Sequence, residues 1–290
     1  MGCPCEVQLE AENIAVANRA AQAAIAEVAR LDEKYSHYRR DNFLARICAD
    51  AAAQRIEVDA ETANLLEFAD TLFRQSVGKF DITAGALTKL WDAQNGRVPS
   101  RHEIAAARAC TGWSRVQWTR PHLRLPSADL RIDLGGIVKE YAADRAAAVC
   151  RDAGVAHGVV DLGGDLAVVG AHADGRLWLA GIKTPSAPEK VYASIALARG
   201  GLATSGDYER ALVIDGQRYS HIIDATTGWP VQGFASVSVI ADSCLVAGAA
   251  STLAMLFGVE EGGAYLRELG LPHLTIDQAG AAGGTIAATS

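Results

Sequence analysis

The sequence predicts an α+β fold, in which mixed sheets are flanked by helices. Apolar residues recur at helical spacing in several segments, and short runs with strand character stand between them. The two kinds of segment do not alternate strictly, as they would in a parallel sheet built from βαβ units. With 290 residues, of which 50% are hydrophobic, the chain can bury a large core. We expect residues 1–290 to form a single domain, with two lobes as the alternative.

Two helices are predicted in the first quarter of the chain. Residues 12–31 and 60–73 carry apolar side chains at intervals of three and four positions. In the first segment this stripe consists of Ile14, Ala17, Ala21, Ile25 and Val28. Stripes of this kind are typical of helices that pack on a core.

The remaining elements follow in chain order. Residues 115–132 predict short strands around polar turns, and 137–153 predict a helix that starts after two glycines. Residues 159–195 predict a run of strands. The alternating segment 234–240 predicts one more strand before an alanine-rich helix over about 245–256.

The most polar stretch, 204–228, is where we expect the chemistry. Thr204 and Ser205 offer hydroxyls next to a glycine turn at 206–207, a combination suited to holding phosphate oxygens. His221 and Asp224 follow, and a carboxylate that orients a histidine makes it a general base. The alternative is that the His-x-x-Asp pair only caps a turn.

A second candidate is the segment 132–145, which predicts a strand, a turn with Gly135 and Gly136, and a helix. The amide groups at a helix start favour an anion, and Lys139 adds a positive charge. The segment is not a Walker loop, and no Gly-x-Gly-x-x-Gly marks a Rossmann unit. The alternative is that the two glycines form only a tight connection.

Two further glycine-containing turns share this pattern. Asp81 and Thr83 stand two residues apart, hence on one face if the chain is extended, and Gly163 and Gly164 interrupt an apolar strand. Four such turns in one chain indicate a shared ligand-binding cleft.

Taken together, these motifs resemble the ApbE family, the FAD:protein FMN transferases. The match runs along almost the whole chain. It includes Ser36-His37-Tyr38, FDITAGAL at 80–87, IDLGG at 132–136 with Lys139, DLGGD at 161–165, TSGD at 204–207 and His221-x-x-Asp224.

The resemblance implies a magnesium-dependent enzyme that cleaves the pyrophosphate of FAD, transfers FMN through a phosphoester to a threonine or serine of an acceptor flavoprotein, and releases AMP. His221 would deprotonate the acceptor hydroxyl, and Asp224 would orient His221. The fold would be ApbE-like, with FAD in a cleft. The implied FAD-binding residues are Ser36, Tyr38, Asp81, Thr83, Asp133, Gly135, Lys139, Gly163, Gly164, Thr204, Ser205, Gly206 and Asp207.

The resemblance also implies magnesium ligands, namely the carbonyl of Gly136 and Thr252. Two of the positions at which the sequence departs from the family bear on this site: Gly248 stands where the family has a ligand aspartate, and Glu140 where it usually has glycine. Magnesium usually keeps a protein carboxylate, so we expect a weakened metal site. Glu140 adds negative charge beside Lys139. Two alternatives therefore remain: a flavin-binding homologue with impaired transfer, and hydrolysis of FAD to FMN and AMP.

Charge and hydropathy limit the partners. With 27 basic and 34 acidic residues, net −7, the chain has no electrostatic footprint for nucleic acid. No apolar stretch reaches the roughly 18 residues of a membrane span, and no signal peptide is apparent. We therefore expect no transmembrane segment and a cytoplasmic location, although family members are often exported or lipid-anchored.

Overall fold

Seven strands form the central sheet, and the predicted α+β class is confirmed. The computed structural model describes residues 2–91, 96–185, 187–207, 212–214 and 216–287. The strand order is β1-β5-β6-β9-β14-β15-β16, and all neighbouring pairs are antiparallel. The strands are β1 (Cys5–Glu10), β5 (His157–Leu162), β6 (Asp165–Gly170), β9 (Gly201–Gly206), β14 (Phe234–Ala241), β15 (His273–Asp277) and β16 (Ala282–Gly284).

Side chains of this sheet alternate between two cores. In β5 and β9, Val160 and Ala203 belong to the larger core, whereas Val159 and Leu202 belong to a second core with the β7–β8 hairpin. That hairpin pairs β7 (Trp178–Thr184) with β8 (Ala187–Leu197). Successive residues of a strand point to opposite faces, so the sheet is covered on both sides.

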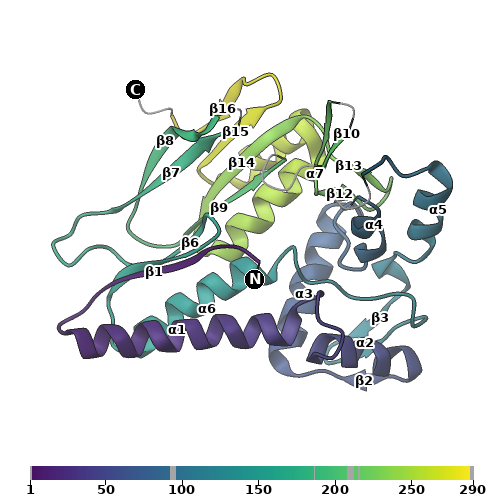
Figure 1. Cartoon of the computed structure of the whole chain (residues 1–290), viewed down its shortest axis with the longest axis horizontal. Helices are drawn as coiled ribbons and strands as arrows, with labels where there is room; N and C mark the ends of the chain where they lie inside the picture. The colour runs from purple at the N-terminus through teal and green to yellow at the C-terminus, as the bar shows by residue number, and fades with distance from the viewer. Residues whose placement is uncertain (1, 92–95, 186, 208–211, 215, 288–290) are drawn as a thin grey trace.

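Three long helices cover the face of the sheet that carries the larger core (Figure 1): α1 (Ile14–Tyr35), α6 (Val138–Asp152) and α7 (Cys244–Leu269). Helix α1 starts at Asn13, whose side chain accepts hydrogen bonds from the amides of Ala15 and Val16. It extends one turn beyond the predicted end, because Leu31 and Tyr35 continue its buried stripe.

The other half of the molecule, at the right of Figure 1, carries the short elements. A three-stranded sheet of order β2-β4-β3 lies there, and two hairpins from later in the sequence pack on α4 and α5 around Leu87 and Trp91. The elements are α2 (Phe43–Ala53), β2 (Ile56–Glu57), α3 (Ala60–Gln75), α4 (Gly85–Leu90), α5 (Arg101–Ala109), a 3-10 turn (Trp113–Arg115), β3 (Gln117–Thr119), β4 (His122–Arg124), β10 (Leu212–Ile214), β11 (Gln217–Tyr219), β12 (Ile223–Asp224) and β13 (Trp229–Pro230).

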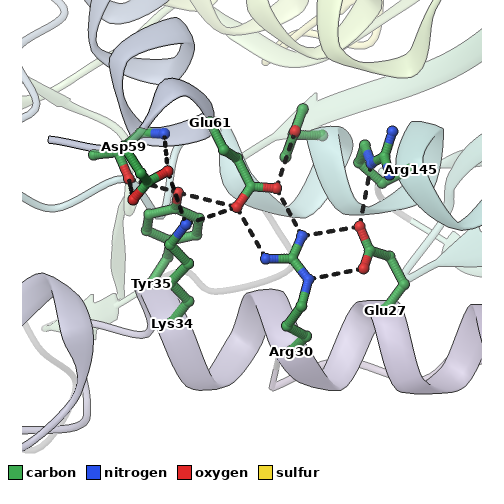
Figure 2. A network of polar contacts seen from close by, with 9 residues as sticks. Glu27, Arg30, Lys34, Tyr35, Asp59, Glu61 and Arg145 are labelled. Atoms are coloured by element: carbon green, nitrogen blue, oxygen red, sulfur yellow. Dashed lines mark hydrogen bonds and ion pairs between the residues drawn. The ribbon is translucent and has the colours of Figure 1, made fainter. Parts of the chain in front are cut away.

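A network of charged side chains ties these two halves together (Figure 2). Glu61 of α3 accepts hydrogen bonds from Arg30 and Lys34 of α1 and from Tyr141 of α6. Glu27 of α1 bonds Arg30 on one side and Arg145 of α6 on the other. The network fixes α3 and α6 on the same side of α1.

Helix α7 bears on the expectation that no segment spans a membrane. Among the described residues it is the one helix long and apolar enough to do so. Gly258, with φ 80° and ψ −174°, interrupts it close to the predicted end at 256, and the helix packs on β9 and β14. Core helices pass the same test of length and composition, and 56% of the most apolar window of α7 is buried. The predicted helix ended two residues before Gly258. It therefore did not include the second part of α7, in which the helical conformation resumes.

Candidate active site

Helices α6 and α7 are joined by a carboxylate that caps α7. The two oxygens of Asp144 accept hydrogen bonds from the amides of Cys244 and Leu245, at 2.8 and 2.9 Å. Burial raises the pKa of Asp144, while these two amide bonds favour its charged form. One turn before Asp144 lies Glu140, and one turn after Cys244 lies Gly248. These two residues are also in contact, so the helices run antiparallel here.

The Glu140 side chain occupies the space beside Gly248. A Cβ atom at position 248 would lie 2.5 Å from Glu140 Cγ and 3.1 Å from Cδ. Glu140 is only 9% exposed, its Oε1 is 3.4 Å from Lys139 Nζ, and its Oε2 is buried with no hydrogen-bond partner among the described residues. The sequence placed Glu140 beside Lys139 but did not reveal that its carboxylate fills the space of a side chain at 248.

A cluster of hydroxyl groups lies one turn further along α7. Ser205 Oγ of β9 is 2.8 Å from Ser251 Oγ and 3.1 Å from Thr252 Oγ1. The predicted phosphate-binding residue Ser205 and the predicted metal ligand Thr252 are thus brought together. Ser251, which sequence reasoning missed, also donates to the carbonyl of Gly248 at 3.0 Å.

Lys139 lies at the same junction, but its charge is shared. Its ammonium group pairs with Asp165, whose other oxygen accepts a hydrogen bond from the amide of Thr204 at 3.0 Å. Thr204 Oγ1 lies 2.8 Å from Ser238 Oγ of the neighbouring strand. Asp165 was not a predicted site residue. The signal was present, because a carboxylate in an apolar strand needs a charged or hydrogen-bonding partner.

The IDLGG turn carries an arrangement that the sequence only partly predicted. Asp133 Oδ1 accepts a hydrogen bond from the amide of Gly135 at 2.8 Å and lies 3.1 Å from His37 Nδ1. Tyr38 is 76% exposed, and its ring is tilted against that of His37 with centroids 3.9 Å apart. Ser36 ends α1, and its carbonyl accepts a bond from Asn42. The motif at 36–38 therefore meets Asp133 through His37.

Asp81 and Thr83 face each other within one turn. Thr83 donates to Asp81 Oδ1 through its amide and its hydroxyl, at 2.7 and 2.6 Å, and Asp81 Oδ2 accepts from the amide of Trp113. Thr83 is buried. Between them, the carbonyl of Ile82 accepts a bond from the amide of Asp133 at 2.6 Å. The turn formed by Asp81 and Thr83 therefore holds the backbone of Asp133 through Ile82.

The DLGGD turn requires its glycines. Gly163 and Gly164 have φ values of 69° and 91°, in the left-handed region that side chains disfavour. The amide of Gly164 donates to Asp161 at 2.7 Å, and a Cβ at 163 would lie 2.8 Å from Cys3 Cβ. The amino-terminal segment therefore lies directly against this turn.

At the end of β9, Gly206 leads into the buried residue Asp207. The carboxylate of Asp207 lies 3.4 Å from Arg218 and accepts from Gln278 at 3.2 Å, so its observed contacts join three segments. Residues 208–211, which follow it, lie outside the described part of the chain.

The His-x-x-Asp segment lies at the edge of a cleft. Asp224 Oδ1 accepts bonds from the amide and hydroxyl of Thr226, at 2.8 and 2.6 Å, which is the turn-capping geometry of the alternative interpretation. Asp224 also lines a cavity of about 420 Å³, together with Tyr219, Trp229 and residues 255–258 of α7. His221 is exposed at the start of this segment.

The cleft has an aromatic wall built on Trp91. The Trp91 ring lies 5.3 Å from Tyr219 and 5.1 Å from Trp229, centroid to centroid, and its Nε1 donates to the carbonyl of Gly228 at 2.9 Å. Trp91 is buried, so it supports the wall from behind, while Trp229 faces the cavity. A cavity of this size with mixed aromatic and polar lining suits an organic ring system.

Comparisons with known proteins bear on the family and the fold of this chain. The sequence model described as the ApbE family matches residues 1–275. The FAD:protein FMN transferase of Vibrio cholerae is 32% identical over 252 residues, which cover 85% of this chain and 75% of that protein. The protein of the same name from Escherichia coli K12 is 30% identical over 259 residues, 86% of this chain and 74% of its own.

Solved structures show the same fold. The ApbE protein of Thermotoga maritima superposes with a TM-score of 0.87 at 32% identity, over 96% of this chain and 93% of that chain. The Pseudomonas stutzeri flavinyl transferase ApbE gives 0.84 at 29% identity, over 100% of this chain and 92% of its own. Sequence, fold and the order of the site motifs lead to one conclusion: this chain belongs to the ApbE family.

Proposed function

We propose that this chain transfers FMN from FAD to a threonine or serine hydroxyl of an acceptor flavoprotein and releases AMP. The relatives named above are FAD:protein FMN transferases. The observation that carries the proposal is the convergence of Lys139, the start of α6 and the Ser205–Thr252 hydroxyls beside one junction. Donors and positive charge of this kind suit the pyrophosphate of a dinucleotide.

In the proposed reaction, the acceptor hydroxyl oxygen attacks the phosphorus on the FMN side of the pyrophosphate. The bond from that phosphorus to the bridging oxygen breaks, and the bridging oxygen leaves with AMP. His221 takes the hydroxyl proton, and its exposed position leaves room for a protein acceptor. Asp224 holds the turn that follows His221. Most of the rate enhancement would come from positioning and charge stabilisation.

The proposal includes a magnesium ion. Among the described residues, no group of three or more His, Cys, Asp or Glu side chains is placed to hold a metal. A magnesium site needs fewer, because this ion usually keeps waters and binds one or two carboxylates together with substrate phosphates. The oxygens that would meet this requirement are Glu140 Oε2 and Thr252 Oγ1 at the junction, together with the carbonyl of Gly136, which the resemblance implies as a ligand. Magnesium bound there would neutralise charge on the pyrophosphate oxygens.

The cleft beside Asp224 would take one of the two ring systems of FAD. It begins at Met255, three residues after Thr252 on the same helix, and Trp229 lines it. An aromatic side chain at the wall of a cavity stacks favourably on a planar ligand.

The test is incubation of the purified protein with FAD, magnesium and a peptide with a single acceptor threonine, followed by mass spectrometry for an FMN adduct and for AMP. We expect both products in equal amounts, and neither with His221→Ala. A peptide with alanine in place of the threonine is the matched control. Bound FAD without either product would favour the flavin-binding alternative. AMP without an adduct would favour hydrolysis.

A further inference from the structure

Glu140 has an unusual environment for a carboxylate. It is 9% exposed, and its Oε2 is buried without a hydrogen-bond partner among the described residues. A buried carboxylate oxygen is costly unless it is paired, hydrogen-bonded or bound to a metal. Oε1 has a charged neighbour, Lys139 Nζ at 3.4 Å, and Lys139 is already paired with Asp165. One oxygen of Glu140 is therefore left without compensation.

The space that holds this carboxylate exists because position 248 is glycine. Any Cβ at 248 would collide with Glu140 Cγ at 2.5 Å, so the two helices accept one side chain at this point of contact, and it comes from α6. The register set by Asp144 and the amides of Cys244 and Leu245 brings Glu140 opposite Gly248. One turn further along α7 lies Thr252, and the Gly135-Gly136 turn precedes α6.

Other oxygen atoms lie beside the same contact. The hydroxyls of Ser205, Ser251 and Thr252 form a cluster, and Ser251 is bonded to the carbonyl of Gly248. Both oxygens of Asp165 are engaged, one by Lys139 and one by the amide of Thr204. Among the described residues, Glu140 Oε2 is the buried side-chain oxygen that has no hydrogen-bond partner, so it can take a cation as its partner.

We propose that Glu140 is the carboxylate ligand of a divalent cation, magnesium, at the α6–α7 junction, and that it reaches this position through the space left by Gly248. This inference rests on the proposed function in one respect: the proposed function identifies the FAD pyrophosphate as the other ligand of the cation. It replaces the expectation of a weakened metal site, because the negative charge missing at 248 is supplied from α6. Hard cations prefer such oxygen ligands.

The experiment measures cation binding directly, without turnover. Mn²⁺ is titrated into the purified protein, with and without FAD, and free Mn²⁺ is followed by electron paramagnetic resonance. Competition with Mg²⁺ then gives the affinity for magnesium. We expect Glu140→Gln, which keeps the volume of the side chain, to weaken Mn²⁺ binding at least tenfold. Glu260→Gln, an exposed carboxamide substitution on α7, is the matched control and should bind as the wild type does.

A second variant tests whether the position of the carboxylate matters. In Glu140→Gly/Gly248→Asp, the carboxylate comes from α7, and the steric conflict is removed together with Glu140. We expect Mn²⁺ affinity within about threefold of the wild type, whereas Glu140→Gly alone loses binding. Circular dichroism and the melting temperature without metal establish that each variant is folded.

FAD affinity gives an independent measurement. Because linkage is reciprocal, a cation that binds together with FAD must raise FAD affinity by the same factor as FAD raises cation affinity. We expect magnesium to tighten FAD binding at least tenfold in the wild type and by less than twofold in Glu140→Gln. Without metal, Glu140→Gln should bind FAD more tightly than the wild type, because a negative charge near the pyrophosphate is removed.

The outcomes separate the two proposals. Wild-type Mn²⁺ affinity in a folded Glu140→Gln protein, or the lack of Mn²⁺ binding by the wild type with FAD present, would overturn the role of Glu140. An FMN adduct would leave the proposed function intact in either case. Glu140-dependent Mn²⁺ binding without any FMN adduct would support this inference and count against transfer.

Discussion

Asp165 and Lys139 form an ion pair whose partners differ in burial, since the Asp165 side chain is 3% exposed and that of Lys139 is 26% exposed. Removing one partner of a buried pair is costly when the remaining charge cannot return to water. The two possible deletions should therefore differ in their effect on stability.

We expect Lys139→Met to lower the free energy of unfolding by about 3–5 kcal/mol, because it strands the buried carboxylate of Asp165. Asp165→Asn should cost less, about 1–2 kcal/mol. Its side-chain oxygen still accepts from Thr204, and Lys139 retains contact with solvent and Glu140. Urea unfolding of both variants measures the difference. Equal losses in the two variants would contradict this prediction, because they would show that an unpaired Lys139 costs as much stability as an unpaired Asp165.

Gly248 and Gly263 lie in the same helix but should respond oppositely to alanine. At Gly263, a Cβ would meet only the mobile end of Arg267 at 3.3 Å, so Gly263→Ala should stabilise by about 0.5–1 kcal/mol through helix propensity. Gly248→Ala should instead destabilise by about 1–3 kcal/mol, because its Cβ overlaps Glu140 Cγ.

A double-mutant cycle attributes this loss to Glu140. In a Glu140→Ala background, the conflict at 248 is removed, and Gly248→Ala should become neutral or stabilising. Thermal melts of the four proteins, without metal or FAD, provide the measurement. A loss that persists in the Glu140→Ala background would mean that other neighbours of Gly248 set the limit.

The sequence predicted α1, α3 and α6 well, because apolar periodicity reports directly on burial, but it missed α2 and the second part of α7. The family motifs predicted Ser205 as a phosphate-binding residue and Thr252 as a metal ligand, and their hydroxyls lie 3.1 Å apart; their roles stay predictions. Glu140 could not be understood in the same way. Its position opposite Gly248 depends on the register of α6 against α7, which Asp144 sets across 100 positions of sequence. Spacing along one helix carries no information about the facing helix.

Asp81 and Thr83 illustrate a different limit. These two polar residues would share one face only if the chain were extended. The chain forms a turn here, in which Thr83 donates to Asp81 through both its amide and its hydroxyl. Short polar side chains compete with regular backbone structure in this way, and a sequence pattern does not distinguish the two cases. Their role in FAD binding stays a prediction.

The network in Figure 2 predicts a specific loss of stability in acid. Hydrogen bonds from Arg30, and then from Lys34, lower the pKa of Glu61 to about 2, against the opposing effect of burial. A carboxyl group with a depressed folded-state pKa stabilises the protein above its unfolded pKa of about 4.3. This contribution is lost as the pH falls from about 5 toward 2.

We expect Glu61→Gln to lower stability at pH 7 by about 1–3 kcal/mol and to flatten the decline of the melting temperature between pH 5 and 3. Glu103→Gln is the matched control. Glu103 is also paired with an arginine, Arg97, and accepts bonds from Ser100 that a glutamine can keep. It lies on the surface, where ion pairs contribute little, so the acid profile of Glu103→Gln should follow that of the wild type. Parallel acid profiles for wild type and Glu61→Gln would contradict the prediction.

Asp224 allows the two interpretations of the His-x-x-Asp segment to be separated. Its Oδ1 caps the turn through Thr226, a bond that an asparagine side chain can also accept, because its carbonyl oxygen can take the place of Oδ1. Because the turn bonds are kept, Asp224→Asn should leave the stability within about 0.5 kcal/mol of the wild type. If Asp224 also orients His221 and stabilises its protonated form, activity should fall. Transfer of FMN should slow at least tenfold, which corresponds to about 1.4 kcal/mol.

Thr226→Val is the complementary variant, since it removes the hydroxyl that bonds Asp224 at 2.6 Å and leaves the carboxylate in place. We expect it to lower stability by about 1 kcal/mol while the transfer rate falls by less than threefold. The rate is measured from FMN-adduct formation at saturating FAD. Full activity in Asp224→Asn would assign the carboxylate to the turn alone, because it would show that catalysis does not need a negative charge beside His221.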